Sequence, residues 1–351
     1  MMSDFSFTQS TDKLYMRKQG VFWALIVLMA ITSCKEKNRF ERNIGDSKLT
    51  VEIHRLDKDL FNVPDGELEA HVADLSQEYG KFLELYSYQI IRVGSPYHAD
   101  YVSRLSQFMN HETVRLAKQE VDKTFGSLAK EQDLLSSAFS YYHYYFPEKV
   151  VPSVYSFVGG FNESIVLADS LLGIGLDKYL GSDCEYYGQL GFPAYMQQNM
   201  KPELIPYDAV RGWVSSEFVF NDSVDNVLSH MVYHGAIQYA MDALFPKSDE
   251  ALKYGFTNEE LAWCKKNQRS MWEYLIEHEI LFSTNHMTIT KYIEPAPFTQ
   301  GFPKVAPGRA IIYLGREIVG AYMEKNPEVT LPQLLALTDY NQLFREAKYK
   351  P

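Results

Sequence analysis

Two histidines with the spacing of a metal site mark the stretch of this sequence where chemistry is most to be expected. His230 and His234 are four residues apart in the segment HMVYH. In a helix, residues four apart lie on one face, one turn from each other, so both imidazoles can reach the same ion. The H-E-x-x-H motif of zinc proteases places its two histidine ligands in this way. His230 and His234 are therefore candidate zinc ligands.

The residue after the first histidine departs from that motif. Position 231 is Met, whereas H-E-x-x-H has a Glu that takes a proton from the metal-bound water. A thioether cannot take over that role because it does not accept a proton at any ordinary pH. Two interpretations stay open: the histidines bind a metal, or they are ordinary core or surface histidines. The sequence favours a protein without peptidase activity.

A helix is needed to bring the two histidines together, and the sequence predicts one over residues 221–246. Asn221, Asp222 and Ser223 are favoured N-cap residues, and Pro246 ends the pattern. Apolar residues recur every three or four positions, which predicts one buried stripe. The stripe consists of Val224, Val227, Leu228, Met231, Gly235 and Tyr239.

The N-terminus has the features of a bacterial lipoprotein signal. Arg17 and Lys18 precede an apolar run over residues 21–31. That run is shorter than the ~20 residues of a membrane-spanning helix and has the length of a signal-peptide core. Small residues then directly precede Cys34, as in a lipobox. We predict a signal peptide over residues 1–33 and lipidation of Cys34.

The sequence predicts two parts after the signal, a short tether and one globular domain. Translation from Met16 would give a signal of ordinary length, so Met16 is the expected start. Residues 34–48 are charged and have little to bury, which predicts a tether. Residues 49–351 are expected to form a single globular domain, because no repeat or low-complexity segment interrupts them.

The charge balance excludes nucleic acid as a partner. The chain has 34 Lys and Arg against 45 Asp and Glu, a formal net charge of −11. Such a surface repels phosphate backbones, and its membrane attachment has to come from a lipid and not from a basic patch. Besides Cys34, the chain has only Cys184 and Cys264, for which a disulfide and free burial are both open.

Helical patterns predominate, and the sequence predicts a mostly helical α+β fold with one small mid-chain sheet. Amphipathic periodicity predicts helices over residues 67–92, 100–126, 131–146, 208–218, 258–282, 310–325, 331–339 and 341–348. Short β-branched and aromatic runs predict strands over residues 150–161, 163–168 and 171–176, with an edge strand over residues 49–55. A small sheet placed before a His-bearing helix suggests a zincin-like layout, in which a sheet edge holds an extended peptide over the helix.

Several segments in combination resemble one protein family. They are IHRLDKDLF, PSVYSFVGGF, IGLDKYLG, GFPAY, HMVYHG, DALFP, WCKKNQRSMWEYLIE, LFSTN, EPAPF and PGRAIIYLGREIVGAYM. With the lipobox at Cys34, they resemble the GldB family of gliding-motility lipoproteins over most of the chain after the signal. The resemblance implies a cell-envelope lipoprotein that faces the periplasm, is held to a membrane by its lipid, and supports the gliding machinery and associated type IX secretion. Envelope proteins of that machinery are then the expected partners.

The same resemblance bears on the histidines. The family is itself similar to predicted zinc proteases, whose H-E-x-x-H falls at His230 to His234. A zinc site needs a third protein ligand. Glu273 and Glu277 lie four apart in the segment WEYLIE, and we take Glu277 as the candidate. The alternative is that Glu277 caps a helix or pairs with an arginine such as Arg309.

Two further polar residues lie inside the resembling segments. Asp177 is expected to cap a helix that starts at Lys178, and Arg309 is expected to hold a buried carboxylate.

Three functions follow from these features. The first is a non-catalytic envelope scaffold or peptide-binding protein with a degenerate metalloprotease-like fold and no cofactor. The second is a zinc-dependent peptidase that uses His230, His234 and a downstream Glu. The third is carbohydrate binding by the tyrosine-rich segment 141–145, for which core packing is the alternative.

Overall fold

The computed structural model describes residues 39–64 and 66–351. Residues 43–351 form one compact unit. Within the described residues, no helix is long and apolar enough to cross a membrane. The predicted signal peptide, Met16 and the lipidation site Cys34 lie outside the described residues.

A four-stranded sheet lies in the N-terminal half of this unit, and its strand order is β1-β2-β4-β3. Its strands are β1 (Ile53–Arg55), β2 (Ser153–Phe157), β3 (Ile165–Ala168) and β4 (Leu171–Gly175). β1 and β4 run parallel to β2, whereas β3 is antiparallel to β4. All four fall inside the predicted runs, and β1 is an edge strand as expected. The mostly helical α+β class is confirmed.

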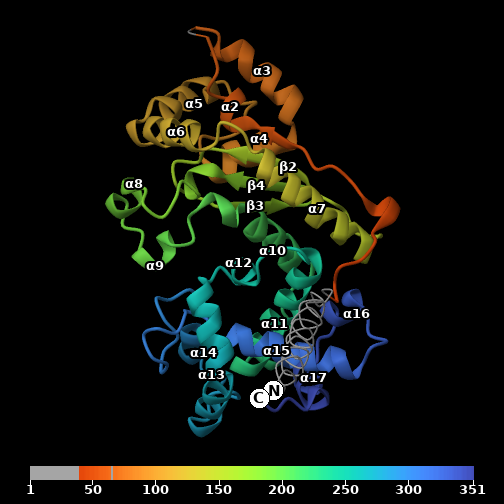
Figure 1. The fold of residues 1–351 in the computed structure, drawn as a ribbon. Coiled ribbons are helices and arrows are strands. Elements are labelled where there is room, and N and C mark those ends of the chain that lie inside the picture. The colour runs from red at the N-terminus through yellow and green to blue at the C-terminus, as the bar shows by residue number, and fades with distance from the viewer. Residues whose placement is uncertain (1–38, 65) are drawn as a thin grey trace, which may run out of the picture. The chain divides into compact units, whose positions relative to one another are not determined.

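Helices cover both faces of the sheet (Figure 1). One face is covered by α2 (Leu56–Asp59), α3 (Leu68–Tyr79), α4 (Lys81–Leu85), the π-helix η2 (Tyr86–Ile90), α5 (Tyr101–Asn110) and α6 (Glu112–Thr124). Phe82 stacks on Tyr155 at 4.2 Å between ring centroids, and Tyr86 meets Phe157 edge-on. Gly173 leaves room for Phe82, because an added Cβ would lie 2.9 Å from that ring.

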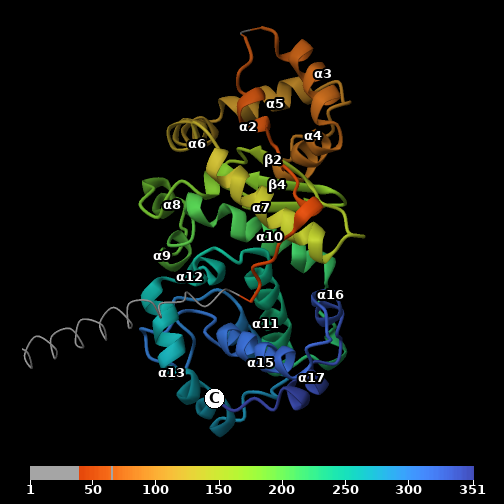
Figure 2. The ribbon, with the colours of Figure 1, turned by 45° about the vertical axis from the view of Figure 1, so that its right-hand side comes forward.

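The other face is covered by α7 (Ala129–Tyr145) and α10 (Ile205–Glu217). Gly212 of α10 lies against Ile165 and Leu167 of β3. α10 also contacts α11 (Val227–Leu244), which is the helix that carries the two histidines. α10 therefore lies between the sheet and α11 (Figure 2). The expected zincin-like layout, with a sheet edge bordering the histidines, therefore finds no support here.

The C-terminal part is built from helices around α11. They are α12 (Glu250–Tyr254), α13 (Asn258–Glu277), α14 (His286–Ile293), α15 (Ile311–Lys325), α16 (Leu331–Leu335) and α17 (Tyr340–Ala347). α11 and α15 make the most extensive contact between two elements. A small segment between the sheet and α10 holds α8 (Glu185–Gln189) and α9 (Ala194–Gln197).

Two predicted helices have wrong boundaries, each for a local reason. The histidine helix starts after Asn226, whose side chain caps Ser229 N at 2.8 Å, and not at residues 221–223. Asn221 instead caps a separate 3-10 turn, η5 (Asp222–Val224), so Val224 is exposed. The helix predicted over residues 67–92 breaks at Gly80, whose φ of 46° is left-handed.

The structure departs from the predicted helices elsewhere as well. His111 interrupts residues 100–126, where α5 ends and α6 begins. α14 had no predicted counterpart, because its eight residues are too few for a clear apolar period. Cys184 and Cys264 are free thiols, and Cys264 is buried.

Candidate functional site

His230 and His234 line a cavity of about 300 Å³. α11 supplies both histidines and Tyr233, η5 and the turn after it supply Asp222 and Asp225, and α14 forms the opposite wall. The two imidazole rings stack at 6.3 Å between centroids. The spacing in the sequence thus correctly predicts a shared helical face that opens into one cavity.

His230 is held by contacts within the protein. Its Nε2 lies 2.7 Å from Oδ1 of Asp225. Its ring stacks on Phe220 at 4.1 Å, and Phe220 in turn stacks on Tyr340 of α17. This hydrogen bond occupies Nε2 and leaves only Nδ1 of His230 for any further partner. The arrangement gives His230 a structural role in joining α11 to α17.

His234 has an environment that favours its neutral form. Burial, followed by the positive charges of Arg309, His230 and Arg211, lowers the pKa of His234 to about 3. The imidazole is therefore uncharged at neutral pH. The same positive surroundings oppose a divalent cation at this position, because they repel it as they repel a proton.

Met231 faces away from the cavity. Its side chain is 0% exposed, and it packs where α11 crosses α15. A Cβ added to Gly315 of α15 would lie 3.1 Å from Cγ of Met231. The position that carries the general base in H-E-x-x-H is thus sealed in a helix–helix contact, where no water can be activated.

The predicted third ligand lies elsewhere. Glu277 is exposed near the end of α13 and does not line the histidine cavity, and Glu273 pairs with Arg269 at 2.7 Å on the surface. The cavity instead includes Glu294 and His286. Glu294 is the first residue of the segment EPAPF, and its place in that segment of the family resemblance was the only feature of the sequence that pointed to this residue. Among the described residues, no group of three or more His, Cys, Asp or Glu side chains is placed to hold a metal ion.

The residues present therefore lack the water-activating base of an H-E-x-x-H zinc centre. One histidine is paired with Asp225, the other lies among arginines, and the base position is buried.

A second cavity, of about 320 Å³, lies beside the first. Asp208 of α10, Tyr254 of α12 and Arg309 line it, together with the loops at residues 295–297 and 307–309. Burial raises the pKa of Asp208 to about 6, against the opposing effects of Arg211, a hydrogen bond from Tyr179 and Arg309. Arg309, expected to hold a buried carboxylate, has Asp208 as a charged neighbour but no hydrogen-bond partner for its Nε.

A buried ion-pair network connects α12, the helix of Tyr254, to α11 and α15. Asp242 of α11 forms an ion pair with Lys253 at 2.7 Å and accepts a hydrogen bond from Nε of Arg316 at 2.8 Å. Arg211 donates to Gln238 at 3.2 Å and to the carbonyl oxygen of Lys253. These contacts fix α10, α11, α12 and α15 relative to one another through side chains that are costly to leave unpaired.

Asp177 connects two segments of the family resemblance, IGLDKYLG and PSVYSFVGGF, by hydrogen bonds. Its fully buried carboxylate accepts from the amides of Gly159 and Phe161, at 3.1 and 2.6 Å. Burial raises its pKa to about 6, despite those hydrogen bonds. The expected helix cap is therefore wrong: Asp177 holds the loop after β2 in place.

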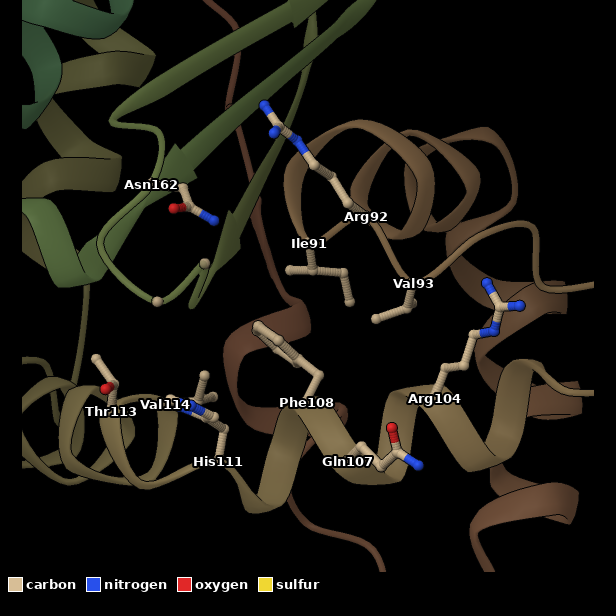
Figure 3. A pocket seen from close by; sticks show the side chains of 12 residues that line it. Ile91, Arg92, Val93, Arg104, Gln107, Phe108, His111, Thr113, Val114 and Asn162 are labelled. Atoms are coloured by element: carbon tan, nitrogen blue, oxygen red, sulfur yellow. The ribbon is translucent and has the colours of Figure 1, made fainter.

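Another cavity, of about 520 Å³, lies next to that loop, between α5, α6 and Gly159–Gly160 (Figure 3). Phe108 projects toward its centre, and Arg92 and Arg104 stand at its rim. Arg104 is already paired with Asp100 at 2.6 Å, and both side chains are exposed. This cavity is an open groove with a polar rim.

The tyrosine-rich segment serves mainly in packing. Tyr141 and Tyr142 are buried in α7, whereas Tyr144 is 41% exposed and meets Tyr145 edge-on.

The fold and these cavities define a mostly helical α+β protein whose histidine pair is built into packing contacts. Comparison with protein families places the chain more closely: residues 37–351 match the family described as "Gliding motility protein GldB", and the chain belongs to that family. Membership connects the protein with gliding motility and with the cell envelope. Comparisons with curated proteins and with solved structures gave no match.

Proposed function

We propose that this protein is a lipid-anchored, periplasm-facing component of the gliding machinery and its associated type IX secretion that binds partner proteins without cleaving them. The observation that carries the non-catalytic part is the burial of Met231 against α15. Hydrolysis by a zincin-like site needs a base within reach of a metal-bound water, and this position is closed to water.

The family and the surface support the binding role. Family membership connects the chain with gliding motility. The buried ion-pair network and the α11–α15 contact make the body rigid, and a rigid body suits a part that positions others. The net charge of −11 favours protein partners over nucleic acid.

Crosslinking in the native envelope tests this function. The chain is tagged, crosslinked in intact cells, and purified with whatever is attached. Recovery of motility or secretion proteins, and their loss in a strain without the tag, is the expected result. Recovery of no envelope protein, together with normal gliding and secretion in a deletion strain, would refute the proposal.

The zinc peptidase stays as a second candidate because His230, His234 and Glu294 line one cavity. Purified protein lacking residues 1–34 is analysed for metal and assayed for casein cleavage with and without a chelator. The scaffold predicts no cleavage and an unfolding temperature that the chelator does not change. Stoichiometric zinc with chelator-sensitive cleavage would establish the peptidase instead.

A further inference from the structure

Arg309 is an unusual residue for a protein interior. Its Nε is buried without a hydrogen-bond partner, and the side chain forms no ion pair within the described residues. Burial, with a contribution from Arg211, lowers the pKa of Arg309 only to about 10, so the guanidinium is charged at neutral pH. The residue as a whole is partly exposed, but a charged guanidinium whose Nε is buried without an acceptor is costly, and proteins rarely keep one for stability alone.

The charged neighbours of Arg309 do not pair with it directly. Arg211 lowers the pKa of Arg309, whereas Glu294 and, to a smaller extent, Asp208 raise it. Asp208 accepts a hydrogen bond from Tyr179 at 3.1 Å rather than from either arginine. Among the described residues no carboxylate forms an ion pair or a hydrogen bond with Arg309, so an anion entering the cavity would supply the acceptor that its guanidinium lacks.

The backbone around Arg309 is held in a strained and fixed conformation. Its φ is 61°, in the left-handed region that a bulky side chain rarely adopts. The buried Thr299 accepts from Ala310 N and donates to the carbonyl oxygen of Pro307, both at 2.8 Å. A Cβ on Gly308 would clash with the carbonyl oxygen of Ala296, so the two loops touch backbone to backbone. The guanidinium is therefore positioned in advance of any ligand.

The cavity next to Arg309 has the walls of a binding site. Its volume of about 320 Å³ is sufficient for a small organic acid or for one or two amino-acid residues. Tyr195, Met196 and Pro297 supply apolar surface, and Asn199 supplies a polar group. Tyr254, which also lines the cavity, has a buried hydroxyl group without a partner. Two residues of the cavity wall, Arg309 and Tyr254, thus each have a buried donor without a partner.

We propose that this cavity binds a carboxylate group and that the guanidinium of Arg309 is its main partner. A guanidinium presents parallel N–H donors that match the two oxygens of a carboxylate. The carboxylate can come from the C-terminus of a peptide or from a free organic acid. The proposal is separate from the scaffold function above, because it concerns a different cavity and does not depend on the histidines.

Competition between free and blocked carboxylates tests the site. The full-length protein in detergent is incubated with a pool of random tripeptides, with the same pool amidated at the C-terminus, and with succinate. Retained ligand is measured by mass spectrometry. We expect the free-acid peptides or succinate to be retained, and the amidated pool to bind about 10- to 100-fold more weakly.

Variants of Arg309 separate a binding role from a structural one. R309Q should lose the preference for free carboxylates, and it should keep or raise the unfolding temperature because it removes an unpaired buried charge. The control K304Q removes a positive charge from the same loop at an exposed position and should bind like the wild type. If R309Q does not fold, R309K carries the test, and it should bind at least several-fold more weakly.

Each outcome decides the proposal. Retention of the peptide pool assigns a peptide C-terminus, whereas retention of succinate alone assigns a free acid, and both support the site. Equal retention of free and amidated peptides with no binding of succinate overturns it. So does wild-type binding by both Arg309 variants, or a marked drop in the unfolding temperature of R309Q, which would show that Arg309 has a stabilising partner in the folded protein.

Discussion

Gly235 of α11 and Gly315 of α15 face each other so closely that the two helix backbones touch. A Cβ on Gly235 would lie well inside 3.0 Å of the Gly315 backbone, and a Cβ on Gly315 would clash with the carbonyl oxygen of Met231. This crossing explains why Met231 is closed off from water, because the backbone of α15 lies directly against the turn of α11 that carries it.

The first prediction concerns this crossing. Gly315→Ala should destabilise the protein by about 3 kcal/mol, because the helices must separate to admit one methyl group. Chemical denaturation measures the loss. Gly188→Ala in α8 is the matched control, since an added Cβ there meets nothing within 4 Å. Equal stability of the two variants would contradict the close contact.

The second prediction concerns the missing base. Met231→Glu restores H-E-x-x-H, yet it should create no casein cleavage and should cost about 3 kcal/mol, because a carboxyl group is forced into a dry contact. Met231→Leu keeps the volume and should cost less than about 1.5 kcal/mol. Zinc-dependent cleavage by the Glu variant would show that this side of α11 reaches water.

The third prediction uses the low pKa of His234. Its folded value of about 3 lies below the ordinary value of 6.5, so the unfolded chain takes up a proton first as the pH falls. The stability that His234 contributes is thus present above pH 6.5 and is lost below it, by about 2 kcal/mol between pH 7 and pH 5.

Comparison with His234→Gln isolates this effect, because Asp177 and Asp208 titrate in both proteins. Their raised pKa values of about 6 act with the opposite sign, stabilising the fold as the pH falls through 6. The stability difference between wild type and variant should therefore shift against the wild type on acidification. Parallel curves from pH 7 to pH 5 would refute a neutral His234.

The fourth prediction concerns the buried ion pairs. Asp242→Asn should cost about 3–5 kcal/mol, because Lys253 and Arg316 would lose a shared buried partner. Glu273→Gln breaks a pair of the same 2.7 Å length with Arg269 on the surface, and it should cost at most about 1 kcal/mol. Similar losses in both variants would mean that burial does not govern these pairs.

The fifth prediction concerns the anchor. Cys34→Ser should release the protein from the membrane fraction, because the thiol that would carry the lipid is gone. Cell fractionation followed by a salt wash measures this. A variant at Cys184, which is also a free thiol, should stay with the membrane. If Cys34→Ser stays bound after the wash, attachment does not depend on that residue.

The local parts of the fold could be predicted from the sequence because they depend on neighbours along the chain. All four strands lie inside the predicted runs, and α7, α10, α11, α13 and α15 follow their apolar periods. Errors arose where a single residue decides, as at Gly80 and Asn226. A left-handed glycine or an N-cap residue does not interrupt the apolar period of the sequence, so a helix predicted from that period continues past its real end.

For the site, the sequence by itself determined that His230 and His234 share a helical face, that the base of the motif is absent, and that the chain is acidic. These follow from spacing and residue type alone. Only the tertiary structure decided that Met231 is turned into α15, that Glu294 rather than Glu277 reaches the histidine cavity, and that the Nε of Arg309 is buried without an acceptor. The reason is that a helical pattern tells which residues share a face, whereas the partner of that face is chosen by packing between segments far apart in the chain.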